Sequence, residues 1–135
     1  MSDDTLVFGV VQSGRFVYGL VRDLAMAKQL VKCASRFGIR ARNFDRADSL
    51  MKSVEETKPF LVILDFENLE CESYKTLKEI RESADAKGVP VIGFVSQSRS
   101  AVKEEAERAG CDRVYLKTEF GAVWSPVFRA VDSLV

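Results

Sequence analysis

Residues 5–24 read TLVFGVVQSGRFVYGLVRDL, and this stretch contains two apolar, β-branched runs separated by a four-residue turn. The first run covers residues 5–11 and the second covers residues 16–21. Only the second run ends in a charged pair, Arg22 and Asp23, and only it leads directly into a segment with helical spacing. If the first run were the core strand, the second would have to begin a long helix with poor helix formers. We therefore predict that residues 16–21 form the first strand of the core sheet.

Downstream of this strand, apolar runs typical of strands alternate with segments of helical periodicity. Further strands are expected over residues 39–44, 60–66, 89–96 and 113–117. Helices are expected over residues 24–37, 73–86, 100–109 and 120–134, the last with an interruption near Pro126. A short helix that carries Leu50, Met51 and Val54 is expected to be capped by Asp45 or Asp48 and to end before Pro59. This alternation predicts a three-layer α/β sandwich, in which helices cover both faces of a parallel sheet and a site lies beyond the carboxyl ends of the strands.

Length and charge restrict the class of protein. A chain of 135 residues that is 47% hydrophobic is long enough for one ordinary domain, which we assign to residues 16–135 with an extension over residues 1–15. Twenty basic and twenty acidic residues cancel, so no electrostatic footprint for nucleic acid is expected. The N-terminal apolar run is seven residues long and follows two aspartates, which is too short for a membrane span and has the wrong flank for a signal peptide.

The cysteine and histidine counts restrict the chemistry. Cys33, Cys71 and Cys111 are far apart and odd in number, which is typical of reduced thiols in a cytoplasmic protein. We expect Cys33 and Cys111 to be small core residues rather than reactive thiols. The chain contains no histidine, which excludes Ser-His-Asp hydrolysis, Cys-His nucleophiles and most zinc sites.

Charged side chains follow several of the predicted strands at the point where each strand ends. Asp23 follows the first strand, Asp65 lies at the end of the run FLVILDF, and Lys117 closes the run RVYLK. Two carboxylates and a lysine around one crevice suit Mg²⁺-assisted phosphoryl transfer to a carboxylate. A simpler alternative is that each charge marks only the point where the chain leaves the core.

Residues 16–135 resemble the receiver (CheY-like) domain of bacterial response regulators. The resemblance rests on the motifs LVRD, LVILDF, VPVIGFVS and AGCDRVYLK and on their spacing, 42 residues from Asp23 to Asp65 and 52 from Asp65 to Lys117. It implies a flavodoxin-like fold with five parallel strands in the order 2-1-3-4-5. It also implies Asp65 as phospho-acceptor, Lys117 as a contact of the phosphoryl group, and a Mg²⁺ site made by Asp23, Asp65 and the backbone carbonyl of Glu67. The partner implied is a sensor histidine kinase.

The sequence departs from the family pattern in the parts that read the phosphoryl group. The fourth strand ends in Val95 where the family has Thr or Ser, and Ser96 comes one position late. Val114 stands at the position of the aromatic switch residue, and Tyr115 beside it is expected to point to the opposite face. Thr118 replaces the proline that commonly follows the lysine.

Arg22 stands where the family has the first of two acids. A guanidinium beside Asp23 and Asp65 would supply positive charge where a cation is otherwise needed, and it would compete with Mg²⁺. We therefore expect Mg²⁺ to bind more weakly than in an ordinary receiver. The alternative is that the arginine stem directs its charge outward, where it pairs with nothing.

Three functions are compatible with these residues. The favoured one is a stand-alone atypical receiver in two-component or phosphorelay signalling, which acts through protein–protein contacts and is phosphorylated on Asp65. The alternative is a pseudo-receiver that serves as an interaction or dimerisation module without phosphorylation. An enzyme on the same fold is disfavoured, because DFEN at residues 65–68 matches the phosphatase DxD motif poorly and no Gly-rich phosphate loop is present.

The N-terminal apolar run has no evident place in this sheet, because the first strand is expected to have neighbours on both sides. We consider that residues 5–11 pair with an edge strand or across a subunit boundary, or that they lie as an ordered arm over apolar surface. A homodimer through this segment or through the last helix, with Phe120, Trp124 and Phe128 at four-residue spacing, is also considered.

Overall fold

The computed structural model describes residues 16–67, 72–96 and 101–132, and strands alternate with helices throughout. The elements in chain order are β2 (Phe16–Leu20), α2 (Leu24–Arg36), β3 (Arg40–Asn43), α3 (Ala47–Glu56), β4 (Leu61–Asp65), α4 (Ser73–Glu82), β5 (Val91–Val95), α5 (Ala101–Arg108), β6 (Arg113–Leu116), the 3₁₀ turn η3 (Lys117–Glu119) and α6 (Phe120–Asp132). The second of the two apolar runs is therefore the first core strand, as predicted. The predictions for residues 5–11 lie outside the described residues.

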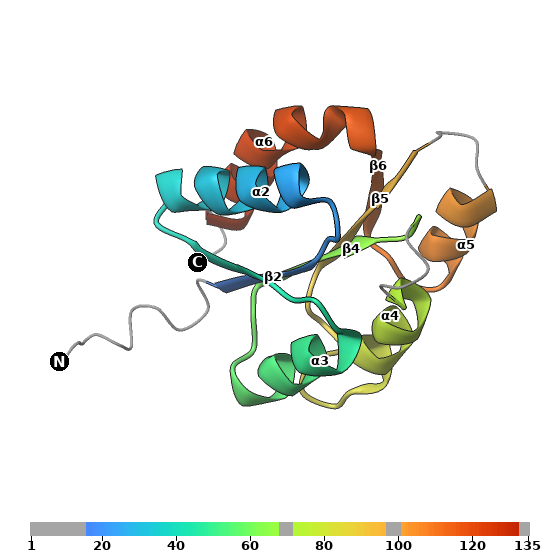
Figure 1. The fold of residues 1–135 in the computed structure, drawn as a ribbon. Coiled ribbons are helices and arrows are strands. Elements are labelled where there is room, and N and C mark those ends of the chain that lie inside the picture. Colours follow the sequence, from blue (N-terminus) through green and yellow to red (C-terminus); the bar gives the residue numbers. More distant parts are fainter. Residues whose placement is uncertain (1–15, 68–71, 97–100, 133–135) are drawn as a thin grey trace, which may run out of the picture.

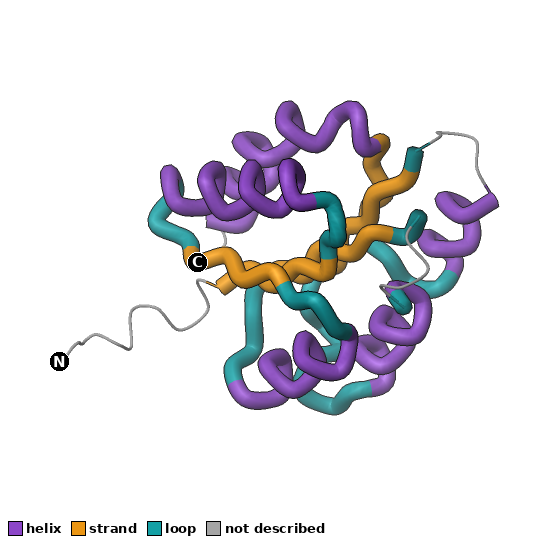
Figure 2. Tube along the Cα trace, viewed as in Figure 1, coloured by secondary structure: helices purple, strands orange, loops and turns teal. Residues whose placement is uncertain are grey.

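The five described strands form one parallel sheet in the order β3-β2-β4-β5-β6. This is the order 2-1-3-4-5 in terms of the predicted strands, so the predicted flavodoxin-like topology is confirmed. Helices α2 and α6 cover one face of the sheet, and α3, α4 and α5 cover the other (Figures 1 and 2). Parallel crossovers require this arrangement, because each connection must pass over a face of the sheet.

Burial along the strands follows their place in the sheet. Every residue of the two central strands β4 and β5 is buried, because helices cover both of their faces. The edge strands β3 and β6 instead combine exposed with half-buried residues. The Arg-rich strand predicted over residues 39–44 is thus an edge strand.

Side chains on the two faces form two separate apolar cores. The α2–α6 core contains an aromatic group in which Trp124 meets Phe120 edge-on at 4.6 Å between ring centroids, and Phe94 lies against both. The other core lies under α3, α4 and α5 and includes Phe66, whose ring lies 4.9 Å from that of Tyr74. These contacts place Phe120 and Trp124, four residues apart on the last helix, against the sheet. The side chain of Phe128 lies outside the described residues.

Arg81, near the end of α4, forms hydrogen bonds with the loops at the amino end of the sheet. Its guanidinium donates to the carbonyl oxygens of Lys87, Val89 and Gly110 and pairs with Asp112 at 2.8 Å. Asp112 in turn accepts from the amide of Val91, the first residue of β5. Hydrogen bonds to a charged group are stronger than neutral ones, so this network secures both the loop before β5 and the loop before β6.

Two predicted helix boundaries are wrong. The helix expected over residues 73–86 ends at Glu82, because Ser83 takes an extended conformation and its hydroxyl accepts from the amide of Ala86, which begins a new turn. The interruption expected near Pro126 does not occur, and α6 continues through that residue. Proline removes only one backbone donor, and the buried aromatic residues before it hold the helix on the sheet.

Burial raises the pKa of the Cys111 thiol to about 12, raises that of the Tyr74 hydroxyl to about 12, and raises that of Tyr18 above its usual value. Cys111 is buried, while Cys33 is half-buried against the α2–α6 core. Both positions agree with the predicted packing role.

The raised pKa values predict a loss of stability at alkaline pH. In the unfolded chain the Cys111 thiol would ionise near 9, whereas in the folded chain it stays protonated up to about 12. The unfolded state therefore binds fewer protons between these values, and the free energy of unfolding is expected to fall as pH rises from about 9 to about 12. Urea titrations across this range measure the slope. Cys111→Ala should flatten it, Cys33→Ala is the matched control, and equal slopes in all three proteins would contradict the prediction.

None of the helices within the described ranges is both long and apolar enough to cross a membrane.

Candidate functional site

Asp65 is the last residue of β4, and its carboxylate is buried at the carboxyl edge of the sheet. The side chain is 2% exposed, and its Oδ2 lies 3.3 Å from the Nζ of Lys117. Its Oδ1 accepts a 3.0 Å hydrogen bond from the backbone amide of Glu67. Among the described residues, the buried carboxylate thus has one cation and one backbone donor as partners, as a charge in the interior requires.

Lys117 reaches Asp65 across the end of an intervening strand. Strand β5 separates β4 from β6, and the register pairs Asp65 with Phe94 and Val95 with Leu116. Lys117 follows Leu116 directly, so its long side chain passes over the end of β5 and bridges about two strand spacings, roughly 10 Å. The structure therefore brings together the two residues on which the phosphoryl-transfer hypothesis depends most.

Asp23 follows β2 at the same edge of the sheet, and it is the N-cap of α2. Its Oδ1 accepts a 3.1 Å hydrogen bond from the amide of Met26, in the arrangement preferred at helix N-termini. A carboxylate offers about four lone-pair sites, so this cap leaves acceptor capacity for a cation.

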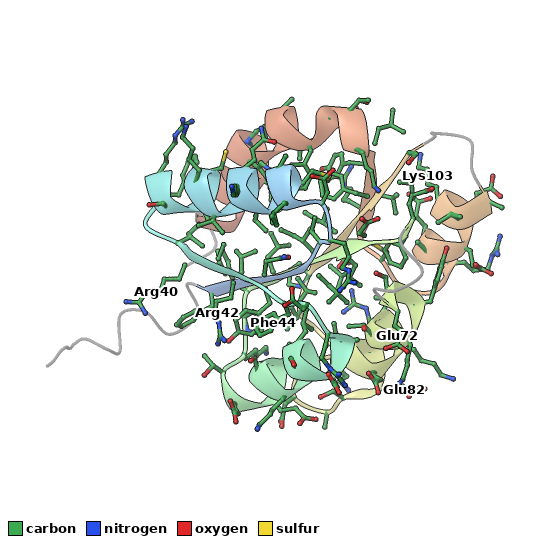
Figure 3. The ribbon with its side chains drawn as sticks, in the orientation of Figure 1. Arg40, Arg42, Phe44, Glu72, Glu82 and Lys103 are labelled. Atoms are coloured by element: carbon green, nitrogen blue, oxygen red, sulfur yellow. The ribbon has the colours of Figure 1, made fainter. Side chains whose placement is uncertain are left out.

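Arg22 is exposed, and its Nη1 donates a 3.0 Å hydrogen bond to the carbonyl oxygen of Asp45. The expectation that an outward-pointing Arg22 would pair with nothing is therefore wrong, because the loop before α3 presents this carbonyl within reach of the stem. Arg22 also lines a groove of about 560 Å³ between α3 and α4, together with charged residues that include Glu72, Lys75 and Glu79. Glu72, labelled in Figure 3, lies at the start of α4 on this side of the molecule.

The residues at the end of β5 and on β6 differ in their burial and in the face of the sheet on which they pack. Val95 is fully buried, and Ser96 beyond it is exposed. Val114 packs against the core under α3, α4 and α5, whereas Tyr115 packs into the α2–α6 core with its ring 6.0 Å from that of Phe94. The tyrosine therefore lies on the face of the sheet opposite to Val114, as its position in the strand predicted.

Sequence reasoning missed two residues that shape this edge. The side-chain amide of Asn43 forms two hydrogen bonds with the backbone of Val21. Its Oδ1 accepts from the Val21 amide at 2.9 Å, and its Nδ2 donates to the Val21 carbonyl at 2.7 Å. Ser73 donates from its hydroxyl to the backbone carbonyl of Asp65 at 2.6 Å. The sequence signals available were a polar residue, Asn43, at the end of an edge strand and a serine, Ser73, at the start of a helix. Neither signal indicates which distant residue the side chain contacts.

The donor set is compatible with Mg²⁺, which prefers carboxylate and carbonyl oxygens and keeps several waters. Within the described ranges, no three or more His, Cys, Asp or Glu side chains gather closely enough to hold a metal by themselves. The described carboxylates at this edge that could contribute to such a site are those of Asp23 and Asp65.

Comparison with solved structures identifies the architecture. A response regulator from Hahella chejuensis is 15% identical, covers 86% of this chain and 93% of its own, and superposes with a TM-score of 0.76. The chemotaxis response regulator CheY4 of Vibrio cholerae is 11% identical, with 86% and 97% of the two chains covered and a TM-score of 0.76. The chain has the fold of a receiver domain. A third structure of this receiver fold is the receiver domain of a Pseudomonas aeruginosa sensor histidine kinase, described with a magnesium ion coordinated in its active-site cleft. It is 15% identical, covers 87% and 96% of the two chains, and has a TM-score of 0.75.

A scan against protein-family models and a search of curated proteins found no match to this sequence. The likeness to the receiver fold is therefore one of structure.

Proposed function

We propose that this chain is an atypical receiver that takes a phosphoryl group on Asp65 and passes its signal on through protein–protein contacts. The observation that carries the proposal is the buried carboxylate of Asp65, paired with Lys117 at 3.3 Å at the carboxyl edge of a receiver fold. A buried acid that retains a lysine partner at a strand end is a costly feature for a purely structural module. The partner implied by this chemistry is a sensor histidine kinase or another phosphodonor protein.

The proposed transfer uses the residues at the carboxyl edge of the sheet. A carboxylate oxygen of Asp65 would attack the phosphorus of a phosphohistidine, so that a P–O bond forms, the P–N bond breaks, and the imidazole leaves with its electron pair and takes up a proton. The ammonium of Lys117 lies where it would offset the charge of the phosphoryl oxygens. Magnesium bound at Asp23, Asp65 and the Glu67 carbonyl would neutralise the same developing charge. The product is an acyl phosphate on Asp65.

A second candidate function is a pseudo-receiver that works without phosphorylation. The residues at the end of β5 and on β6 favour it. Val95 places a buried methyl group where a hydroxyl would contact the phosphoryl oxygens, and Tyr115 packs on the other face of the sheet. The parts that would sense a phosphoryl group and transmit its presence thus have other roles. In this alternative, Asp65 and Lys117 serve only the stability of the fold.

Arg22 is expected to weaken the binding of magnesium. Arg22 directly precedes Asp23 in the chain, and its guanidinium hydrogen-bonds to the carbonyl oxygen of Asp45 in the loop before α3. It therefore adds a positive charge at the residue beside one of the carboxylates that would hold the ion. We therefore propose that Mg²⁺ binds less tightly than in a receiver with two acids after its first strand.

The test is a two-dimensional NMR titration with Mg²⁺ followed by beryllofluoride, a mimic of the phosphoryl group on aspartate. We expect shifts around Asp65, Asp23 and Lys117 that require both reagents, and about tenfold or greater tightening of Mg²⁺ binding in Arg22→Asp. Asp65→Asn is the control, because its neutral amide should abolish the beryllofluoride response.

No shifts in the parent at high Mg²⁺ would favour the pseudo-receiver. Equal magnesium affinities in the parent and in Arg22→Asp would refute the role of Arg22.

A further inference from the structure

We propose that Asn43 is a positioning residue for Asp23 and holds its carboxylate at the carboxyl edge of the sheet, where it can contact a magnesium ion. The part of this inference that concerns magnesium rests on the proposed function, which places Asp23 in the metal site. Asn43 is the last residue of β3, and Gly19 of β2 lies opposite it in the sheet. From this position its side chain acts on the segment that follows β2.

The side-chain amide of Asn43 continues the pairing of β2 with β3 past the end of both strands. The amide of Phe44 donates to the carbonyl of Gly19 at 2.8 Å. A parallel ladder uses every second residue of a strand, so the next groups of this chain that face β3 are the amide and the carbonyl of Val21. Both bond to the side chain of Asn43, at 2.9 and 2.7 Å. Val21 is 2% exposed, so these bonds satisfy the backbone groups of a buried residue.

Gly19 leaves the space that the side chain of Asn43 occupies. A Cβ at Gly19 would lie 3.1 Å from the Oδ1 of Asn43 and 3.2 Å from a methyl carbon of Leu30 on α2. The backbone of Gly19 has no positive φ, so glycine is needed here for space and not for chain conformation. A larger residue at this position would press the amide of Asn43 away from Val21.

The two chain segments separate directly after this contact. One continues into α2 on one face of the sheet, and the other continues into α3 on the opposite face (Figure 1). Arg22 links the same two segments again, since its Nη1 donates to the carbonyl of Asp45. Asp23 is the second residue after Val21, so its backbone follows directly on a segment that the side chains of Asn43 and Arg22 both hold.

The carboxylate of Asp23 depends on this backbone support. Asp23 is exposed, so packing against neighbours does not fix its side chain. Its Oδ1 accepts from the amide of Met26 at 3.1 Å, and a magnesium ion would need another lone pair of the same carboxylate. Both contacts require one orientation of the side chain. Replacing a residue that orients a metal ligand lowers metal affinity by about tenfold or more, because the ligand is no longer held in place.

The experiment compares the parent with Asn43→Ala by NMR and measures two quantities. The exchange rate of the Met26 amide reports the position of Asp23 without any metal, and we expect it to rise at least about tenfold in Asn43→Ala. The dissociation constant for Mg²⁺ should also rise about tenfold. Asp23→Ala is the reference for a lost cap. Adding Asn43→Ala to Asp23→Ala should change the exchange of Met26 no further, because both substitutions act through the same carboxylate.

The matched control is Ser83→Ala. It also removes a hydrogen bond between a side chain and the backbone, but in the loop that leads to the amino end of β5, at the opposite end of the sheet. Gly19→Ala tests the same contact without altering Asn43, and it should speed the exchange of the Met26 amide in the same direction. The near-ultraviolet signal of the buried Trp124 checks that each variant is folded.

Exchange of the Met26 amide that is the same in the parent and in Asn43→Ala would overturn the proposal. An equal rise in Ser83→Ala would also overturn it, because the effect would then be one of general stability. Faster exchange in Asn43→Ala with an unchanged affinity for Mg²⁺, or with no Mg²⁺ binding in any variant, would support the positioning of Asp23. The same result would contradict the magnesium site of the proposed function, so the two failures are distinguishable.

Discussion

Lys117→Met is expected to lower the free energy of unfolding by about 1–3 kcal/mol near neutral pH. The substitution keeps an apolar stem but removes the ammonium that lies 3.3 Å from the carboxylate of Asp65. Because Asp65 is 2% exposed, it would be left as a buried charge whose hydrogen-bond donor among the described residues is the Glu67 amide. Lys117 is itself 29% exposed, and solvent screening keeps the expected loss below that of a fully buried pair.

Urea unfolding of four proteins measures this interaction. Asp65→Asn removes the negative charge but can still accept the hydrogen bond from Glu67, so the double variant Asp65→Asn/Lys117→Met should lose less stability than the sum of the two single variants. Lys78→Met, at an exposed position on α4, is the matched control and should stay within about 0.5 kcal/mol of the parent. Additive losses in the double variant would mean that Asp65 and Lys117 do not interact energetically.

Gly93→Ala is expected to destabilise the fold by about 1–3 kcal/mol, because β5 has no room for a methyl group at this residue. A Cβ at Gly93 would overlap the ring of Phe66 and would lie 3.3 Å from the Sγ of Cys111. The ring cannot retreat freely, since it packs against Tyr74 on its other side. The backbone of Gly93 has no positive φ, so the cost comes from packing and not from chain conformation.

The matched control is Gly88→Ala, where an added Cβ would meet no atom within 4 Å. This variant should be neutral or slightly more stable, because alanine restricts the unfolded chain. Thermal unfolding compares the two, and Phe66→Leu introduced together with Gly93→Ala should recover part of the loss by making room. If Gly93→Ala and Gly88→Ala unfold alike, the close contact between Phe66 and β5 is not present in solution.

The predicted strand order and the carboxyl-edge site depended on features that are local in sequence. A central parallel strand is covered on both faces, so it appears as an unbroken apolar run, as FLVILDF does before Asp65. A strand that delivers an acid and leads into an amphipathic helix could be identified as the first core strand for the same reason. Since parallel strands end at one edge, the positions of Asp65 and Lys117 predicted that they would meet.

Helix ends were predicted less well, because they depend on single side-chain contacts. Apolar periodicity continues past Glu82, yet α4 ends there because Ser83 binds the amide of Ala86. Conversely, Pro126 is a strong local signal for a break, and α6 continues because Phe120 and Trp124 are buried in the core. Tertiary packing thus outweighs the local preference in one case, and a local hydrogen bond outweighs periodicity in the other.

By itself the sequence determined the fold, the identity of the first strand and the pairing of an acid with a lysine, since each follows from periodicity or from the geometry of parallel strands. Only the tertiary structure decided three long-range contacts between a side chain and the backbone: Arg22 on the Asp45 carbonyl, Asn43 on the backbone of Val21, and Arg81 on Gly110. Each of these joins a side chain to a backbone atom 22 to 29 residues away. Almost any residue offers a carbonyl oxygen, so no pattern in the sequence marks which one a distant side chain will reach.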